Sequence, residues 1–181
     1  MIEDKLLIWK LKHGSSDALA RIYLKYESFL LTLATALLND VHTAEDVLHD
    51  FFVSFAGSTD KLKLEGNLQS YLATCIANRA RDAIRSRKRA PVGLDDTADT
   101  IPSNNTPPDL AAVCDEQLQQ LSHALNQLPY EQREVVLLHI YSRLKFRQIA
   151  KAQGLSLNTI QSRYRYGINK LRSLLNGEVQ K

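Results

Sequence analysis

Large apolar residues recur every three or four positions along most of this chain, which is the spacing of a helix with one buried face. The pattern is longest between residues 18 and 38, where one face carries Leu19, Ile22, Tyr23, Tyr26, Phe29, Leu30, Leu33, Leu37 and Leu38. The same spacing predicts helices over residues 3–12, 44–57, 67–89, 110–128 and 130–143. With only seven Gly and five Pro, the chain suits helices better than a sheet with many turns, so we predict an all-α fold.

Polar residues with capping or turn preferences separate these helices. The predicted N-caps are Ser15, Ser16 or Asp17 for residues 18–38, Thr43 for 44–57, Asn67 for the helix that ends at 89, and Asp109 for 110–128. Asn39 and Asp40 interrupt the longest pattern, and Pro129 ends the helix before it. In the helix over 110–128 we expect one buried stripe, formed by Leu110, Val113, Leu118, Leu121, Leu125 and Leu128.

Residues 145–175 carry the most specific pattern in the chain. Phe146, Ile149 and Ala150 share one face of a short helix, Gly154 suits a tight turn, and Ser156 is a predicted N-cap for a second helix. This arrangement is typical of a helix-turn-helix whose second helix enters the major groove of DNA. Donors for phosphates and base edges follow the turn: Ser156, Asn158, Thr159, Gln161, Ser162, Arg163, Arg165 and Arg172. The alternative is a helical hairpin with a solvated basic face.

A second group of cations lies at the C-terminal end of the predicted helix over residues 67–89. Its last three turns hold Arg79, Arg81, Arg85, Arg87, Lys88 and Arg89. Cations near a helix C-terminus favour the helix dipole, but this number exceeds that need. With Tyr71 and Asn78 nearby, the helix end suits a single nucleic-acid strand, with phosphates on the cations and bases on the ring and amide.

The charge distribution supports a nucleic-acid binder. The net charge is only +3, yet residues 117–181 hold ten basic and three acidic side chains, and residues 91–116 hold six acidic ones and no Lys or Arg. The Pro- and Asp-rich stretch that begins at Ala90 predicts a flexible acidic linker between two small helical domains. We place the domains at residues 1–90 and 113–181, with the linker at 91–112.

Other classes of function find little support in the sequence. The chain has no apolar run near the roughly 18 residues of a membrane span and no signal peptide, which predicts a cytoplasmic protein. Cys75 and Cys114 are too few and too differently placed for a disulfide framework or metal site, and we expect no cofactor, although a redox pair stays an open alternative. Without a Gly-rich phosphate loop or a nucleophile–base pair, an enzyme is not expected.

The order of these parts resembles the bacterial sigma factors of RNA polymerase, in particular their extracytoplasmic-function (ECF) subgroup. The resemblance covers nearly the whole chain and is carried by three segments, TAEDVLHDFF, SYLATCIANRARDAIRSRKR and LPYEQREVVLLHIYSRLKFRQIAKAQGLSLNTIQSRYRYGINKLR. The last segment is the most specific, because both its Leu-Pro-x-x-x-Arg opening and its later Ser-x-x-Thr-x-x-Ser-Arg fit the family pattern. Five positions depart from that pattern: His49, Tyr71, Arg143, Arg147 and Gln148.

The resemblance implies a role for each part. The first domain would bind core polymerase, through the clamp helices of the largest subunit, with Glu45, Asp46, His49 and Asp50. It would bind the minus-10 element of promoter DNA with Lys61, Lys63, Asn67, Tyr71, Asn78, Arg79, Arg81 and Arg85. The second domain would bind the polymerase flap and read the minus-35 element with Ser156, Asn158, Thr159, Gln161, Ser162, Arg163 and Arg165. An anti-sigma factor is a further partner that the resemblance allows.

Two other non-enzymatic functions stay open on the sequence alone. One is a helix-turn-helix regulator that does not associate with core polymerase, and the other is an interaction protein that mimics a sigma factor. A regulator needs neither the acidic face at 45–50 nor the second basic helix at 78–89. A mimic has no use for basic residues in both domains.

Overall fold

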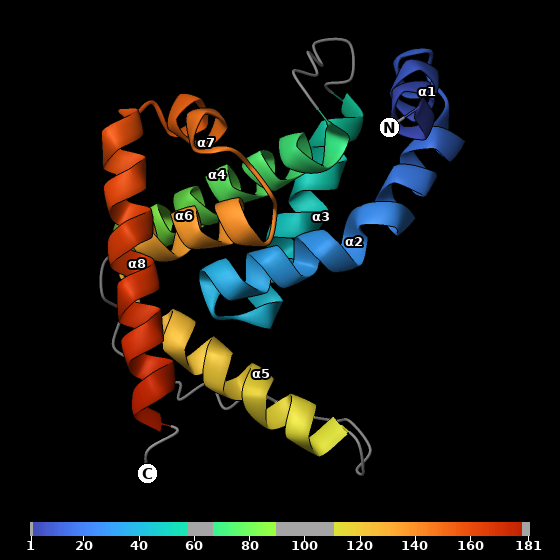
Figure 1. Cartoon of the computed structure of the whole chain (residues 1–181). Helices are drawn as coiled ribbons and strands as arrows, with labels where there is room; N and C mark the ends of the chain where they lie inside the picture. Colours follow the sequence, from blue (N-terminus) through green and yellow to red (C-terminus); the bar gives the residue numbers. More distant parts are fainter. Residues whose placement is uncertain (1, 58–66, 90–110, 179–181) are drawn as a thin grey trace.

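A computed structural model of the chain describes residues 2–57, 67–89 and 111–178, and these ranges form eight α-helices (Figure 1). The helices are α1 (Ile2–Lys12), α2 (Ser16–Leu38), α3 (Val41–Gly57), α4 (Leu68–Arg89), α5 (Ala111–Asn126), α6 (Tyr130–Ile140), α7 (Phe146–Gln153) and α8 (Leu157–Glu178). No strand occurs in the described ranges, so the all-α prediction is confirmed. Lys61, Lys63 and most of the predicted linker lie outside them, as does the side chain of Cys114.

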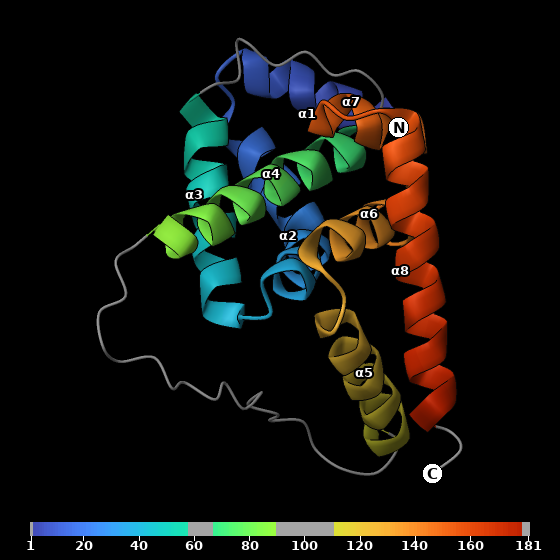
Figure 2. The same cartoon turned by 90° about the vertical axis from the view of Figure 1, so that its left-hand side faces the viewer.

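The N-terminal helical group consists of α1–α4. Helices α2, α3 and α4 pack against one another in all three pairs, and α1 packs along α2 (Figure 2). The apolar face predicted for α2 supplies fully buried residues such as Ile22, Leu30 and Leu33. Phe52 lies edge-on to Tyr23, with the ring centroids 4.9 Å apart. This packing fixes the faces that α3 and α4 leave to solvent.

The predicted caps Ser15 and Asn67 are confirmed, the predicted cap of α3 is not, and Asp109 lies outside the described residues. Ser15 accepts a hydrogen bond from the Ala18 amide, and Asn39 ends α2 with a left-handed φ of 56°. Helix α3 already begins at Val41, so the prediction of Thr43 as N-cap is wrong. The Asp40 carboxylate accepts from the His42 amide and the Thr43 hydroxyl, and the helix therefore starts earlier.

The C-terminal helical group consists of α5–α8. Helix α6 packs against α7 and α8, and α5 packs against α8. Leu125 near the end of α5 and Leu128 just beyond it are buried as expected, but Leu118 and Leu121 are exposed, with 63% and 40% of their surface accessible. The single buried stripe predicted for this helix is therefore wrong. Toward its N-terminus, α5 extends away from the other helices (Figure 1).

The end of α6 also differs from the predicted boundary. The helix expected over 130–143 ends at Ile140, because Arg143 adopts a left-handed φ of 56°. The chain bends there, and the backbone amide of Leu144 bonds back to the Leu138 carbonyl at 3.0 Å. Arg143 thus keeps the turn in a conformation that normally favours glycine.

Candidate nucleic-acid interface

Helices α7 and α8 form the predicted helix-turn-helix. Gly154 has a φ of 65° at the end of α7, which confirms the tight turn, and the next amide, Leu155, bonds to the Ala150 carbonyl at 3.0 Å. Ser156 is the N-cap of α8, because its hydroxyl accepts a hydrogen bond from the Thr159 amide at 3.1 Å. These contacts fix the angle at which α8 leaves the turn.

The inner face of α8 is held by close packing on α6 and α7. Ile160 and Leu171 are buried. Gly167 lies so close to α6 that a Cβ atom there would be 3.0 Å from Cγ2 of Val136. His139 of α6 stacks on Phe146 and lies edge-on to Tyr164, with centroid distances of 4.0 and 4.9 Å. The opposite face of α8 is thereby directed outward on a rigid support.

Most of the predicted minus-35 residues lie on that outward face. Ser156, Asn158, Gln161 and Arg165 are exposed, and Thr159 and Ser162 are half-buried. The guanidinium of Arg165 lies over the Tyr166 ring, 5.3 Å from its centroid. Arg163 differs from the others, since it is half-buried and donates a hydrogen bond to Oε1 of Gln153 at 3.4 Å. Arg163 therefore faces α7 rather than solvent.

The basic residues of α4 are dispersed around the helix rather than gathered on one face. Arg79 donates to the Ser54 hydroxyl and lies over the Phe51 ring, 5.8 Å from its centroid. Arg85 is exposed, and its nearest carboxylate, Asp82, is 3.9 Å away. Arg87 reaches across to Asp40 at 3.0 Å, and the hydrogen bonds from Thr43 and Arg87 lower the pKa of that carboxyl to about 2.

The remaining minus-10 candidates occupy the N-terminal part and the middle of α4. The side-chain oxygen of Asn67 accepts from the Ser70 amide at 2.7 Å, which confirms Asn67 as the cap. Tyr71 is half-buried, and burial raises the pKa of its hydroxyl to about 12. Asn78 accepts from Arg81 at 3.3 Å. Cys75 is half-buried, and burial raises the pKa of its thiol.

The acidic face of α3 is exposed in full. Glu45, Asp46, His49 and Asp50 all point away from the core, because the other face of α3 is occupied by the buried residues Ala44, Val47, Leu48, Phe51, Phe52 and Phe55. Nδ1 of His42 lies 3.8 Å from the Glu45 carboxylate. The structure therefore places the four predicted polymerase-binding residues on one solvated surface.

Sequence reasoning missed two residues of α6 that join the two helical groups. Arg133 and Glu134 are buried, with 9% and 1% of their surface exposed. The Arg133 guanidinium donates to the Leu37 carbonyl at 2.8 Å and to Asn126 Oδ1 at 2.9 Å. Glu134 accepts from Arg81 at 2.5 Å. The available signal was a pair of charged residues directly before the apolar run 135–138, but Arg81 lies 53 positions from Glu134, and Leu37 lies 96 positions from Arg133.

Comparison with known families assigns the chain. A family model for sigma-70 region 2 matches residues 22–90, and one for sigma-70, region 4 matches residues 118–171. The chain belongs to the sigma-70 family. Among its relatives, the RNA polymerase sigma factor CarQ of Myxococcus xanthus is 29% identical over 174 residues, or 94% of this chain and 96% of CarQ.

A further relative is itself named as an ECF sigma factor, and a solved sigma factor shares the fold. The ECF RNA polymerase sigma factor SigW of Bacillus subtilis is 26% identical over 180 residues, covering 94% of this chain and 96% of SigW. The solved structure of the sigma factor RpoE in complex with the anti-sigma factor NepR, from Bartonella quintana, aligns with a TM-score of 0.65 and 25% identity. That alignment covers 87% of this chain and 96% of RpoE.

Proposed function

We propose that this ECF sigma factor binds core RNA polymerase and directs it to promoters, with residues 1–90 and 113–181 acting as separate recognition domains. It acts as a DNA-binding subunit in the cytoplasm, without an active site of its own. Within the described ranges, no helix is both long and apolar enough to cross a membrane.

The observation that carries the proposal is the combination of the acidic face of α3 with the donor-rich face of α8. Asp46 and Asp50 are exposed one helical turn apart, where they are available to the basic side chains of a polymerase clamp. Asn158, Gln161 and Arg165 are exposed on the first three turns of α8, and the N-terminal part of a recognition helix is the part that reaches base edges. A regulator that does not bind polymerase needs only the second surface.

In vitro transcription tests the proposal. Core polymerase and the purified chain, incubated with a fragment library of the source genome, should yield discrete transcripts that core polymerase alone does not give. Arg165→Ala should weaken promoter binding by about 1–3 kcal/mol. Lys170→Ala, on the exposed C-terminal half of α8, removes one cation from a residue not assigned to DNA and serves as the control for charge alone. Binding of promoter DNA without any polymerase-dependent transcript would favour the regulator instead.

An anti-sigma partner is part of the proposal. The solved relative RpoE is in complex with the anti-sigma factor NepR. The exposed apolar residues Leu118 and Leu121 of α5 and Val41 of α3 border a groove between the two helical groups, which the half-buried Leu31 and Ala36 of α2 also line. A groove of this kind suits the apolar face of a partner helix.

A further inference from the structure

Tyr166 differs in exposure from the other large apolar residues of α8. It is 57% exposed, whereas the other large apolar side chains between positions 157 and 177 are buried or half-buried. A single exposed apolar residue needs no explanation by itself. The position of Tyr166 among the predicted DNA-binding residues, and the cation that lies over its ring, point to a role in binding.

Tyr166 lies on the same stripe of α8 as two residues predicted to bind DNA. Asn158, Ser162 and Tyr166 stand four positions apart, and side chains at this spacing are neighbours along one helix face. The opposite face of α8 is fixed by its support, since Gly167 lies against Val136 of α6. Tyr166 therefore points outward and extends the donor-rich face by one turn beyond Ser162.

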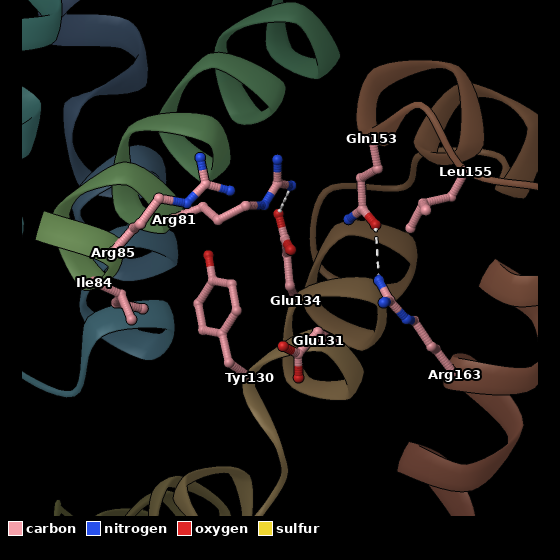
Figure 3. A pocket seen from close by; sticks show the side chains of 9 residues that line it. All are labelled: Arg81, Ile84, Arg85, Tyr130, Glu131, Glu134, Gln153, Leu155 and Arg163. Carbon is pink, nitrogen blue, oxygen red and sulfur yellow. Dashed lines mark hydrogen bonds and ion pairs between the residues drawn. The ribbon is translucent and has the colours of Figure 1, made fainter. Parts of the chain in front are cut away.

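The two arginines in the first three turns of α8 are held in different ways. Arg163 uses an N–H donor of its guanidinium for Oε1 of Gln153, and Figure 3 shows it extending from α8 toward the end of α7. The guanidinium of Arg165 instead lies over the Tyr166 ring, 5.3 Å from the ring centroid. This attraction is electrostatic and occupies no hydrogen-bond acceptor, which leaves the N–H donors of Arg165 available to a base edge or a phosphate.

An aromatic ring in the major groove favours thymine over the other bases. Thymine alone presents a methyl group there, at C5, and apolar side chains contact it. The carbons of the ring offer no hydrogen bond to the edges of the other three bases. Successive base pairs are about 3.4 Å apart, so a ring 5.3 Å from the Arg165 guanidinium reaches a pair about one or two steps from the one that Arg165 binds.

We propose that Tyr166 is a specificity-determining residue of α8, whose ring contacts the C5-methyl group of a thymine in the minus-35 element. This thymine lies about one or two base pairs from the base or phosphate that Arg165 binds. The inference rests on the proposed function, because it adds one residue to the DNA-binding face of α8. Loss of the ring removes the preference for thymine at one position.

Selection of DNA duplexes by the polymerase-bound protein is the first test. Wild type, Tyr166→Phe and Tyr166→Ala, each bound to core polymerase, select from duplexes of a transcribed promoter that are randomised over the minus-35 element. Wild type and Tyr166→Phe, which keeps the ring, should both prefer thymine at one position. Tyr166→Ala should lose this preference and keep those at positions that neither Tyr166 nor Arg165 contacts. Because Tyr166 is exposed, the three proteins should have similar circular dichroism spectra and urea midpoints.

Replacement of the selected thymine by deoxyuridine tests the contact itself, because it removes only the C5-methyl group and keeps every hydrogen-bonding group of the base. The affinity of wild type and of Tyr166→Phe should fall about fourfold, or about 0.8 kcal/mol, the usual value for one buried methyl-sized group. The affinity of Tyr166→Ala should stay the same. Asn169→Ala is the matched control, because it shortens another exposed side chain of α8 and keeps the ring. It should respond to deoxyuridine as the wild type does.

The same loss of affinity in wild type and Tyr166→Ala would come from the duplex rather than from the ring, and would overturn the methyl contact. A thymine preference that Tyr166→Ala retains would overturn it too, as would a wild type that prefers thymine at no position. Failure of the wild type to select any duplex or to direct transcription would instead contradict the proposed function, and this inference with it. The two failures are therefore distinguished by the wild-type protein alone.

Discussion

Gly167 allows the proposed recognition helix, α8, to approach α6 closely. Adding a side chain at this position tests the packing that orients α8. A Cβ at this position would lie 3.0 Å from Cγ2 of Val136 and 3.4 Å from Cβ of Gln132. Val136 is 3% exposed and β-branched, so its side chain has one preferred rotamer in a helix and little room to turn away. Gly167→Ala gains about 1 kcal/mol of helix propensity but incurs overpacking of about 1–3 kcal/mol. We expect a net loss of about 1 kcal/mol.

Urea unfolding followed by circular dichroism measures this loss as a lower midpoint at unchanged slope. Gly177→Ala is the matched control, because no other side chain lies within 4 Å of a Cβ at that position of the same helix. It should be neutral or stabilising. Adding Val136→Ala removes the clashing methyl, so the double variant should be less destabilised than the sum of the two single ones. A Gly167→Ala protein that is more stable than the wild type would refute the reasoning.

Two further predictions concern the backbone and the acid range. Arg143→Gly should raise stability by up to about 1 kcal/mol, because Arg143 has a left-handed φ of 56° that glycine adopts without strain; its urea midpoint should rise. Asp40 has its pKa lowered from 3.8 to about 2, so the stabilisation it gives is present above pH 3.8 and is lost as the pH falls toward 2. Asp40→Asn should therefore flatten the decline of the melting temperature between pH 5 and pH 2.5, and an unchanged decline would contradict this cause.

Much of the fold followed from local rules. The apolar spacing, the caps Ser15, Asn67 and Ser156, and the turn at Gly154 depend on neighbours within a few residues, and each has its expected place. The errors also have local causes. Both Asp40 and Thr43 have side chains that can cap α3. The Asp40 carboxylate accepts a hydrogen bond from the His42 amide, so the helix begins earlier in the sequence than a cap at Thr43 would allow.

The arrangement of the candidate site depends on distant partners and could not be read from spacing. The exposure of Leu118 follows from how far α5 reaches beyond the other helices, which its own periodicity does not encode. The orientation of Arg81 depends on Glu134, 53 positions later. The orientation of Arg163 on α8 likewise depends on a residue of another helix. Helical spacing alone predicted a solvent-facing side chain, but Gln153 at the end of α7 accepts its hydrogen bond.

The central claim is that the acidic face of α3 binds polymerase, and a capture experiment tests it most directly. Asp46→Arg with Asp50→Arg reverses two exposed charges and leaves the buried face of α3 intact. Charge reversal at such a contact should cost several kcal/mol. Asp17→Arg, at an exposed position of α2, is the control. We predict that the immobilised double variant fails to retain core polymerase while the control and the wild type retain it. Capture of core polymerase by the double variant at the wild-type level would contradict the account.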